Sequence, residues 1–144
     1  MEYNETYFYS PPSIMSEYLE KTILQTIAAN GDSKLANHAY FTFLKSDVYL
    51  PIEKGTSEEP RVLFLEQNEH VFLPVFSDQQ YLSQWAGDEF DKIDLYSLSG
   101  IELLKGLGDD VTLAFNPGTP SYKEFNPEEI NKLKTMVVKI QSLL

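Results

Sequence analysis

The residues that could do chemistry are few, and their spacing matches no catalytic or metal-binding motif. The two histidines, His38 and His70, lie far apart in the chain and form no His-x-x-x-His pair. The chain has no cysteine, which excludes disulfides, thiolate nucleophiles, iron-sulfur clusters and zinc sites built on Cys pairs. Gly-x-Ser-x-Gly and glycine-rich phosphate loops ending in Lys-Ser or Lys-Thr are also absent. We therefore predict no catalytic residue, no metal site and no cofactor.

Two segments invite a chemical interpretation, and in both a simpler one is favoured. Gly106-Leu107-Gly108 looks like part of a dinucleotide loop, but Val111 stands where the third glycine belongs and a predicted helix precedes it. It is interpreted as a helix end. The run from residue 88 to 94 has enough carboxylates for calcium, but Phe90 and Lys92 stand where oxygen ligands are required. It is interpreted as a solvated loop.

Four residues follow two predicted strands and could border one small polar site. Ser77 and Asp78 follow the first strand at a helix start, and Asn116 and Gly118 follow the second. Ligands of open α/β sheets sit outside the carboxyl ends of strands, and the free N–H groups of a helix start attract anions. If the two strands are parallel neighbours, these residues would form a ligand-binding site. The alternative, which we favour, is a helix cap and a turn that serve folding alone.

Helices are predicted where apolar residues recur three and four positions apart. Two lie near the N-terminus, two short ones follow strands, and the longest runs from residue 127 to the C-terminus. Capping residues mark their starts, with a glutamine or glutamate three positions later in three cases. The expected caps are Ser13, Asp32, Ser77, Ser99 and Asn126.

Strands are predicted at residues 48–53, 61–66, 70–76, 93–96 and 111–115. Pro51 cannot donate a hydrogen bond to a ladder, which indicates an edge or irregular strand. Asn116-Pro117-Gly118 suits a type II turn. The order of elements predicts a single α/β domain over residues 13–144, with α+β as the alternative. Its mixed sheet of about five strands is flanked by two helices at the N-terminal side and one long C-terminal helix. Residues 1–12 are expected to be a tail or an edge segment.

The charge of the chain excludes some partners. The sequence has 22 Asp plus Glu and 11 Lys plus Arg, a formal net charge of -11, and Arg61 is its one arginine. Such a chain repels nucleic acid and anionic membranes, whereas it would attract a basic protein or simply stay in solution. No apolar run reaches the roughly 20 residues of a membrane span, and no signal peptide is recognised at Met1, so we expect a cytoplasmic protein.

Three segments, in this order and spacing, carry a family resemblance. They are Val48-Tyr49-Leu50-Pro51-Ile52, Leu73-Pro74-Val75-Phe76-Ser77-Asp78 and Leu113-Ala114-Phe115-Asn116-Pro117-Gly118. Together they resemble the N-terminal domain of the SseB family, the bacterial "enhanced serine sensitivity" proteins, over about Leu35 to Leu144. The resemblance implies an α/β domain with a mixed sheet flanked by helices, and it brings no catalytic residue with it.

Two functions from different classes follow. We expect a non-catalytic bacterial cytoplasmic domain that binds a protein partner as an accessory, regulatory or immunity-type module. The alternative is a small-molecule binder, for example of an amino acid, with its site near Asn116-Pro117-Gly118. An enzyme that uses only carboxylates and tyrosines is a third and weaker alternative.

Overall fold

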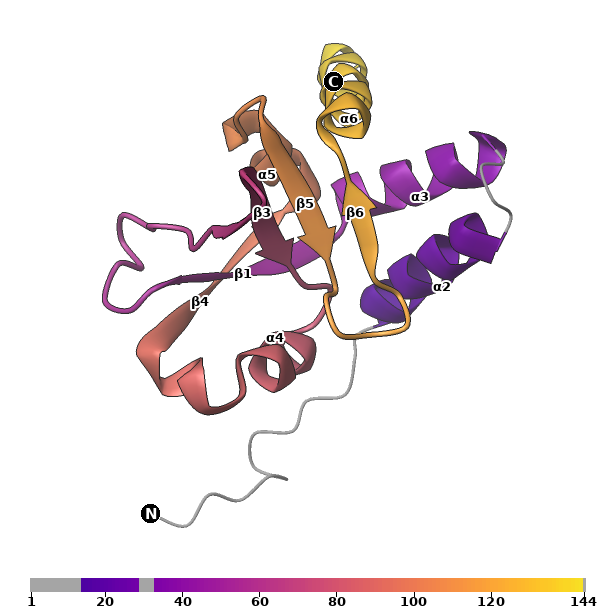
Figure 1. The fold of residues 1–144 in the computed structure, drawn as a ribbon. Helices are drawn as coiled ribbons and strands as arrows, with labels where there is room; N and C mark the ends of the chain where they lie inside the picture. The colour runs from indigo at the N-terminus through magenta and orange to yellow at the C-terminus, as the bar shows by residue number, and fades with distance from the viewer. Residues whose placement is uncertain (1–13, 29–32, 144) are drawn as a thin grey trace.

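The computed structural model describes residues 14–28 and 33–143, which form a mixed α/β fold (Figure 1). Its helices are α2 (Ile14–Ala28), α3 (Ser33–Lys45), α4 (Gln79–Ala86), the 3₁₀ helix η1 (Gly87–Lys92), α5 (Gly100–Gly106) and α6 (Pro127–Ser142). None of these helices is long and apolar enough to cross a membrane. The expected caps Ser13 and Asp32 and the expected tail of residues 1–12 lie outside the described residues.

The strands of the described residues form two sheets rather than one. They are β1 (Asp47–Glu53), β2 (Leu65–Gln67), β3 (His70–Val75), β4 (Ile93–Ser99), β5 (Val111–Phe115) and β6 (Lys123–Phe125). β1 pairs antiparallel with β4, and the other four follow the order β2-β3-β5-β6. β3 and β5 are parallel neighbours, while β2 and β6 pair antiparallel at the two edges. The mixed sheet flanked by helices that the sequence predicts is therefore present, accompanied by a second, two-stranded sheet.

Pro51 explains why the two sheets do not merge. β1 meets the end of β3 where the backbones of Tyr49 and Phe76 exchange two hydrogen bonds, of 2.8 and 2.9 Å. The next β1 residue that faces the same way is Pro51, which has no N–H to continue the ladder. Its carbonyl accepts from the Leu63 amide instead, at 3.1 Å. β1 is thus an edge strand of its sheet, one of the two alternatives that Pro51 indicates.

The segment before β3 differs from the prediction. A strand is expected over residues 61–66, but β2 covers only Leu65–Gln67, so the prediction is wrong for the first four residues. They run beside β1 instead, with a bridge between Val62 and Ile52. The turn at residues 68–69 has positive φ angles of 52° and 66°, as in the two-residue turns that match the twist of a hairpin. β6 is unpredicted because three residues are too few to show a period of two.

Three aromatic rings form the centre of the core between the helices and the four-stranded sheet. Phe43 of α3 packs against Phe115 of β5 and Phe125 of β6, with ring centroids 5.8 and 5.4 Å apart. α5 and α6 complete this side of the sheet (Figure 1). α5 begins at Gly100, which lies directly against the backbone of Phe43 and Leu44. A glycine is needed here because no side chain fits between the two helices.

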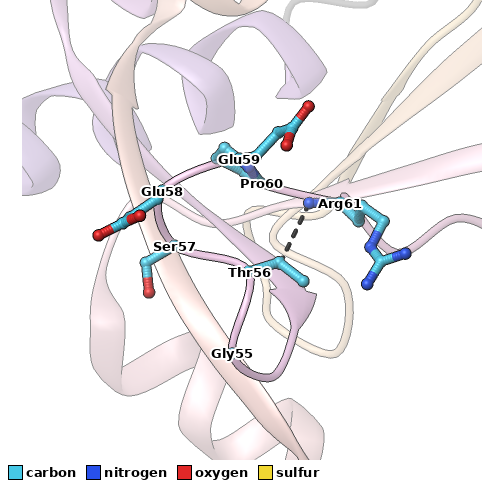
Figure 2. A pocket seen from close by; sticks show the side chains of 7 residues that line it. All are labelled: Gly55, Thr56, Ser57, Glu58, Glu59, Pro60 and Arg61. Atoms are coloured by element: carbon cyan, nitrogen blue, oxygen red, sulfur yellow. Dashed lines mark hydrogen bonds between the residues drawn. The ribbon is translucent and has the colours of Figure 1, made fainter.

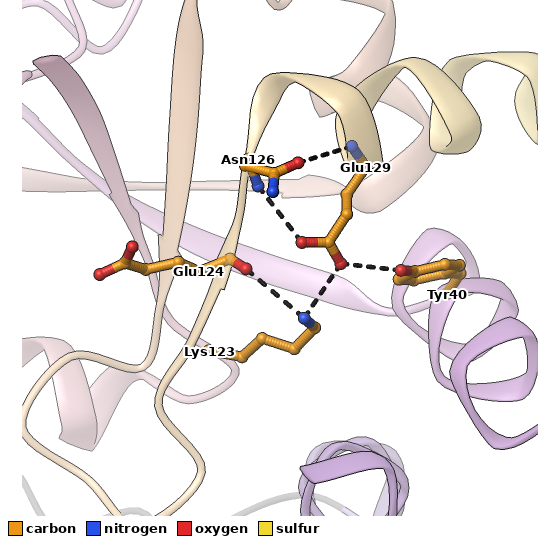
Figure 3. A network of polar contacts seen from close by, with 5 residues as sticks. All are labelled: Tyr40, Lys123, Glu124, Asn126 and Glu129. Atoms are coloured by element: carbon orange, nitrogen blue, oxygen red, sulfur yellow. Dashed lines mark hydrogen bonds and ion pairs between the residues drawn. The ribbon is translucent and has the colours of Figure 1, made fainter. Parts of the chain in front are cut away.

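A partly buried polar network attaches α6 to the rest of the molecule (Figure 3). Glu129 Oε2 accepts from the Tyr40 hydroxyl at 2.7 Å and from Lys123 Nζ at 3.0 Å. Asn126 and Glu129 also form the capping box expected at the start of this helix, with Pro127 in its first turn. Burial, followed by the bond to Glu129, raises the pKa of Tyr40 above its ordinary value. These hydrogen bonds and the Lys123–Glu129 ion pair therefore connect α3, β6 and α6.

Candidate functional site

The carboxyl ends of β3 and β5 bring Ser77 and Asn116 together in a buried polar cluster. Asn116 is completely buried, and its Oδ1 accepts from the Ser77 amide at 2.8 Å. Its Nδ2 donates to Ser77 Oγ at 2.9 Å and to Ser121 Oγ at 3.0 Å. Both amide hydrogens of Asn116 are thus used within the protein. β3 and β5 are parallel neighbours, as the hypothesis of a shared polar site requires.

The backbone at Asn116 has a conformation that few residue types adopt. Its φ is 51°, and its own amide donates to the carbonyl of Val75 at 2.8 Å. Asparagine tolerates this left-handed region better than other residues with side chains. The following type II turn is confirmed: Gly118 has φ 82°, and the Thr119 amide donates to the Asn116 carbonyl at 3.2 Å. Asn116 therefore ends β5, starts the turn and links both to β3.

The cap of α4 is not the residue that the sequence predicts. Asp78 is the N-cap, and its Oδ1 accepts from the Gln80 amide at 2.9 Å. Ser77, the expected cap, is one position too early, and Asn116 already bonds both its amide and its hydroxyl. The caps expected at Ser99 and Asn126 are confirmed. Prediction from the Ser-x-x-Gln pattern fails here because a long-range partner competes for the serine.

Gly118 lies apart from the other three predicted site residues. It is exposed and borders a shallow hollow of about 200 Å³ on the outer face of the four-stranded sheet, together with Leu65, Phe72 and Tyr122. Ser77, Asp78 and Asn116 do not line this hollow. The structure thus brings two predicted residues into direct contact, places Asp78 beside them as a cap, and leaves Gly118 on another surface.

Sequence reasoning missed two members of the polar cluster, Ser121 and Glu20. Ser121 Oγ lies 3.4 Å from Glu20 Oε1, which also accepts from the Tyr81 hydroxyl at 2.7 Å. Burial and the bond to Glu20 raise the pKa of Tyr81 to about 12, so its hydroxyl acts as a hydrogen-bond donor near neutral pH. No local pattern could have identified these contacts, because α2, α4 and the loop after β5 are distant in sequence.

An apolar groove of about 260 Å³ is lined by residues of the two-stranded sheet, of α5 and of the loop before β2. Its lining includes Leu50 of β1, Tyr96 and Leu98 of β4 and Leu103 of α5. Pro60, Val62 and Phe64 of the loop before β2 also line it, and Phe64 is 50% exposed. Half-exposed aromatic residues at an apolar groove are typical of protein-binding surfaces.

Residues 55–61 enclose a larger hollow, of about 840 Å³, within a single loop (Figure 2). The Arg61 amide donates to Thr56 Oγ1 at 3.2 Å, which closes the loop on itself. The carboxylates of Glu58 and Glu59 point away from each other in Figure 2. Because its polar groups do not converge on a common point, this hollow is a weaker candidate than the groove. In the residues that the structure describes, no cluster of acids and histidines could hold a metal ion.

A family model described as the SseB protein N-terminal domain matches residues 21–132. No curated protein matches the chain.

Proposed function

The chain belongs to the family of SseB protein N-terminal domains, and on this premise we propose that it is a non-catalytic protein-binding domain. It acts as an accessory, regulatory or immunity-type module in a bacterial cytoplasm. One observation carries the proposal: apolar and aromatic side chains surround an open groove, whereas Ser77 and Asn116 of the predicted site bond to each other. A satisfied polar cluster has nothing left to offer a substrate, but an apolar groove gains free energy when a partner covers it.

The charge of the protein supports a basic partner. A formal net charge of -11 accelerates encounter with positive proteins, and this attraction weakens as salt screens it. The groove itself carries one carboxylate, Glu102, at the start of α5. Apolar contacts in the groove would then provide most of the affinity, and the surrounding charge would select the partner.

Phe64→Ala is expected to reduce capture of a partner from host lysate by about tenfold or more, because it removes the exposed ring at the groove. Leu65→Ala is the matched control. Leu65 is the next residue and 42% exposed, but it borders the hollow on the outer sheet face. Because both side chains are exposed, each variant should melt at nearly the same temperature as the unaltered protein. Quantitative mass spectrometry of the captured proteins at low and high salt measures the effect.

The same comparison can contradict the proposal. Equal capture by the Phe64→Ala variant and the unaltered protein would show that the groove is not the docking surface. Loss of capture with Leu65→Ala alone would assign docking to the outer sheet face.

A second candidate function is the binding of a small molecule such as an amino acid, favoured by the hollow beside Gly118 and Tyr122. A volume of about 200 Å³ suits a ligand of this size. In this case free amino acids should raise the melting temperature in a saturable way, and Tyr122→Ala should abolish the shift because Tyr122 lines the hollow. A flat response across the amino acids, with an unaltered fold, would remove this candidate.

A further inference from the structure

The outer edge of β4 is unpaired within the part of the chain that the structure describes. We propose that the protein partner adds an extended, basic segment to this edge as an extra β-strand. Its alternate apolar residues would face the groove. This inference rests on the proposed protein-binding function and specifies how the partner binds. Strand addition supplies main-chain hydrogen bonds for affinity and side-chain pockets for specificity.

The hydrogen bonds of β1 establish which groups of β4 are free. Tyr49 and Glu53 donate their amides away from β4, to Phe76 and Arg61. The alternate residues of β1 must therefore bond to β4, where their partners are Leu98, Tyr96 and Asp94. The residues between these, Leu95 and Ser97, consequently direct their N–H and C=O groups outward. Neither backbone has a further hydrogen-bond partner among the described residues.

β4 also lacks two of the features that protect strand edges. Its seven residues, Ile93–Ser99, include no proline and no lysine. The edge strands of the larger sheet, β2 and β6, are only three residues long, and the far edge of β1 is occupied by residues 61–63 and Phe76. β4 is thus the longest strand with an open edge in the described structure.

The groove lies on the correct face for an added strand. Tyr96 and Leu98 are directly opposite Leu50 and Val48, and cross-strand partners project from the same face of a sheet. Tyr96, Leu98 and Leu50 line the groove. A residue paired with β4 on this face would place its side chain about 5 Å from Tyr96 or Leu98. Apolar residues at every second position would therefore reach the groove.

Charge favours a basic strand over a second copy of this chain. η1, which precedes β4, carries the exposed carboxylates of Asp88, Glu89 and Asp91. The one lysine of η1, Lys92, forms an ion pair with Glu89, with Nζ 3.0 Å from Oε2. Glu102 lies just beyond the other end of β4. A copy of the chain would bring the same carboxylates and a second charge of -11, which repel. A segment with lysine or arginine among apolar residues would be attracted.

Ser97→Pro in the full chain tests the edge. It removes an outward N–H but leaves the ladder to β1, whereas the control Ser97→Ala keeps the N–H. The probe is a short fluorescent peptide of alternating valine and lysine, with a scrambled peptide of equal composition as its control. We expect the dissociation constant to rise about tenfold with Ser97→Pro and to stay unchanged with Ser97→Ala. Melting temperatures verify that both variants fold.

Backbone methylation of the probe tests the same contact on the unaltered protein. Two versions of the peptide carry N-methyl groups on alternate amides, one set for each edge of the strand. Only one edge of an added strand pairs with β4, so one version should bind and the other should fail. Equal binding of both, or equal binding of the scrambled peptide, would overturn strand addition.

The outcomes distinguish this inference from the proposed function. If Phe64→Ala abolishes capture of the natural partner while Ser97→Pro does not, the protein binds partners in the groove but not by strand addition. A dimer in sedimentation that Ser97→Pro separates would assign the edge to a second copy and overturn the proposal. If deletion of residues 1–12 tightens peptide binding, the edge of β4 would be assigned to the chain's own N-terminal segment, which would also overturn the proposal.

Discussion

Asn116→Ala is expected to lower the free energy of unfolding by about 3 kcal/mol or more. The substitution leaves the buried Ser77 amide without its acceptor and removes donors from Ser77 Oγ and Ser121 Oγ. Each buried polar group left unsatisfied costs about 1 to 3 kcal/mol. Alanine at a φ of 51° adds about 1 to 2 kcal/mol of backbone strain. Urea denaturation of the purified protein measures the change.

Two further variants separate the causes. Asn116→Gly removes the side chain but accepts the backbone conformation, so it should be less destabilising than Asn116→Ala by about 1 kcal/mol. Ser121→Ala affects only one of the two Nδ2 hydrogens of Asn116 and should have the smallest effect. A loss below about 0.5 kcal/mol for Asn116→Ala would contradict the folding role of this residue.

Gly100→Ala should destabilise the protein by about 3 kcal/mol or more, at the upper end of the effects of overpacking. A Cβ at this position would lie 2.8 Å from the Cα of Leu44 and 2.9 Å from the carbonyl carbon of Phe43, and closer still to the carbonyl oxygen of Phe43. These are backbone atoms of α3 and cannot rotate away. Relief requires α5 to move from α3, which also weakens the bond from the Gly100 amide to the Ser46 carbonyl, 2.9 Å long.

Gly106→Ala is the matched control, because Gly106 is the last residue of the same helix. A Cβ there meets no atom within 4 Å, so alanine should be neutral or should stabilise by up to about 1 kcal/mol. Thermal and urea unfolding of both variants test the comparison. Similar stabilities for the two alanine variants would mean that α5 is not packed tightly against α3.

The helix and strand types follow from local sequence, and most of them are predicted correctly. Ser99 and Asn126 cap the helices they are expected to cap, since their partners are three residues away in the chain. Gly106-Leu107-Gly108 ends a helix as expected. Local sequence fails where a distant residue competes. Asn116 takes both polar groups of Ser77, so the cap of α4 moves to Asp78.

The division of the strands between two sheets depends on contacts that sequence patterns do not encode. The apolar run of residues 62–65 predicts a continuous strand, but residues 61–63 pair with β1, where the Pro51 carbonyl accepts from the Leu63 amide. In the same way, nothing in the residues of β4 indicates that its outer edge has no partner. That property depends on which strand lies beside it, and strand order arises from the packing of the whole chain.

The sequence by itself determined which chemistries are excluded, where most helices and strands lie, and to which family the chain is similar. Composition, charge and local spacing are sufficient for these conclusions because they involve residues within a few positions of one another. Only the tertiary structure decided that Ser77, Asn116 and Ser121 satisfy one another, that Gly118 faces a different surface, and that Phe64 borders an apolar groove. These arrangements depend on long-range packing, in which one buried asparagine can use the polar groups that a local pattern assigns to a helix cap.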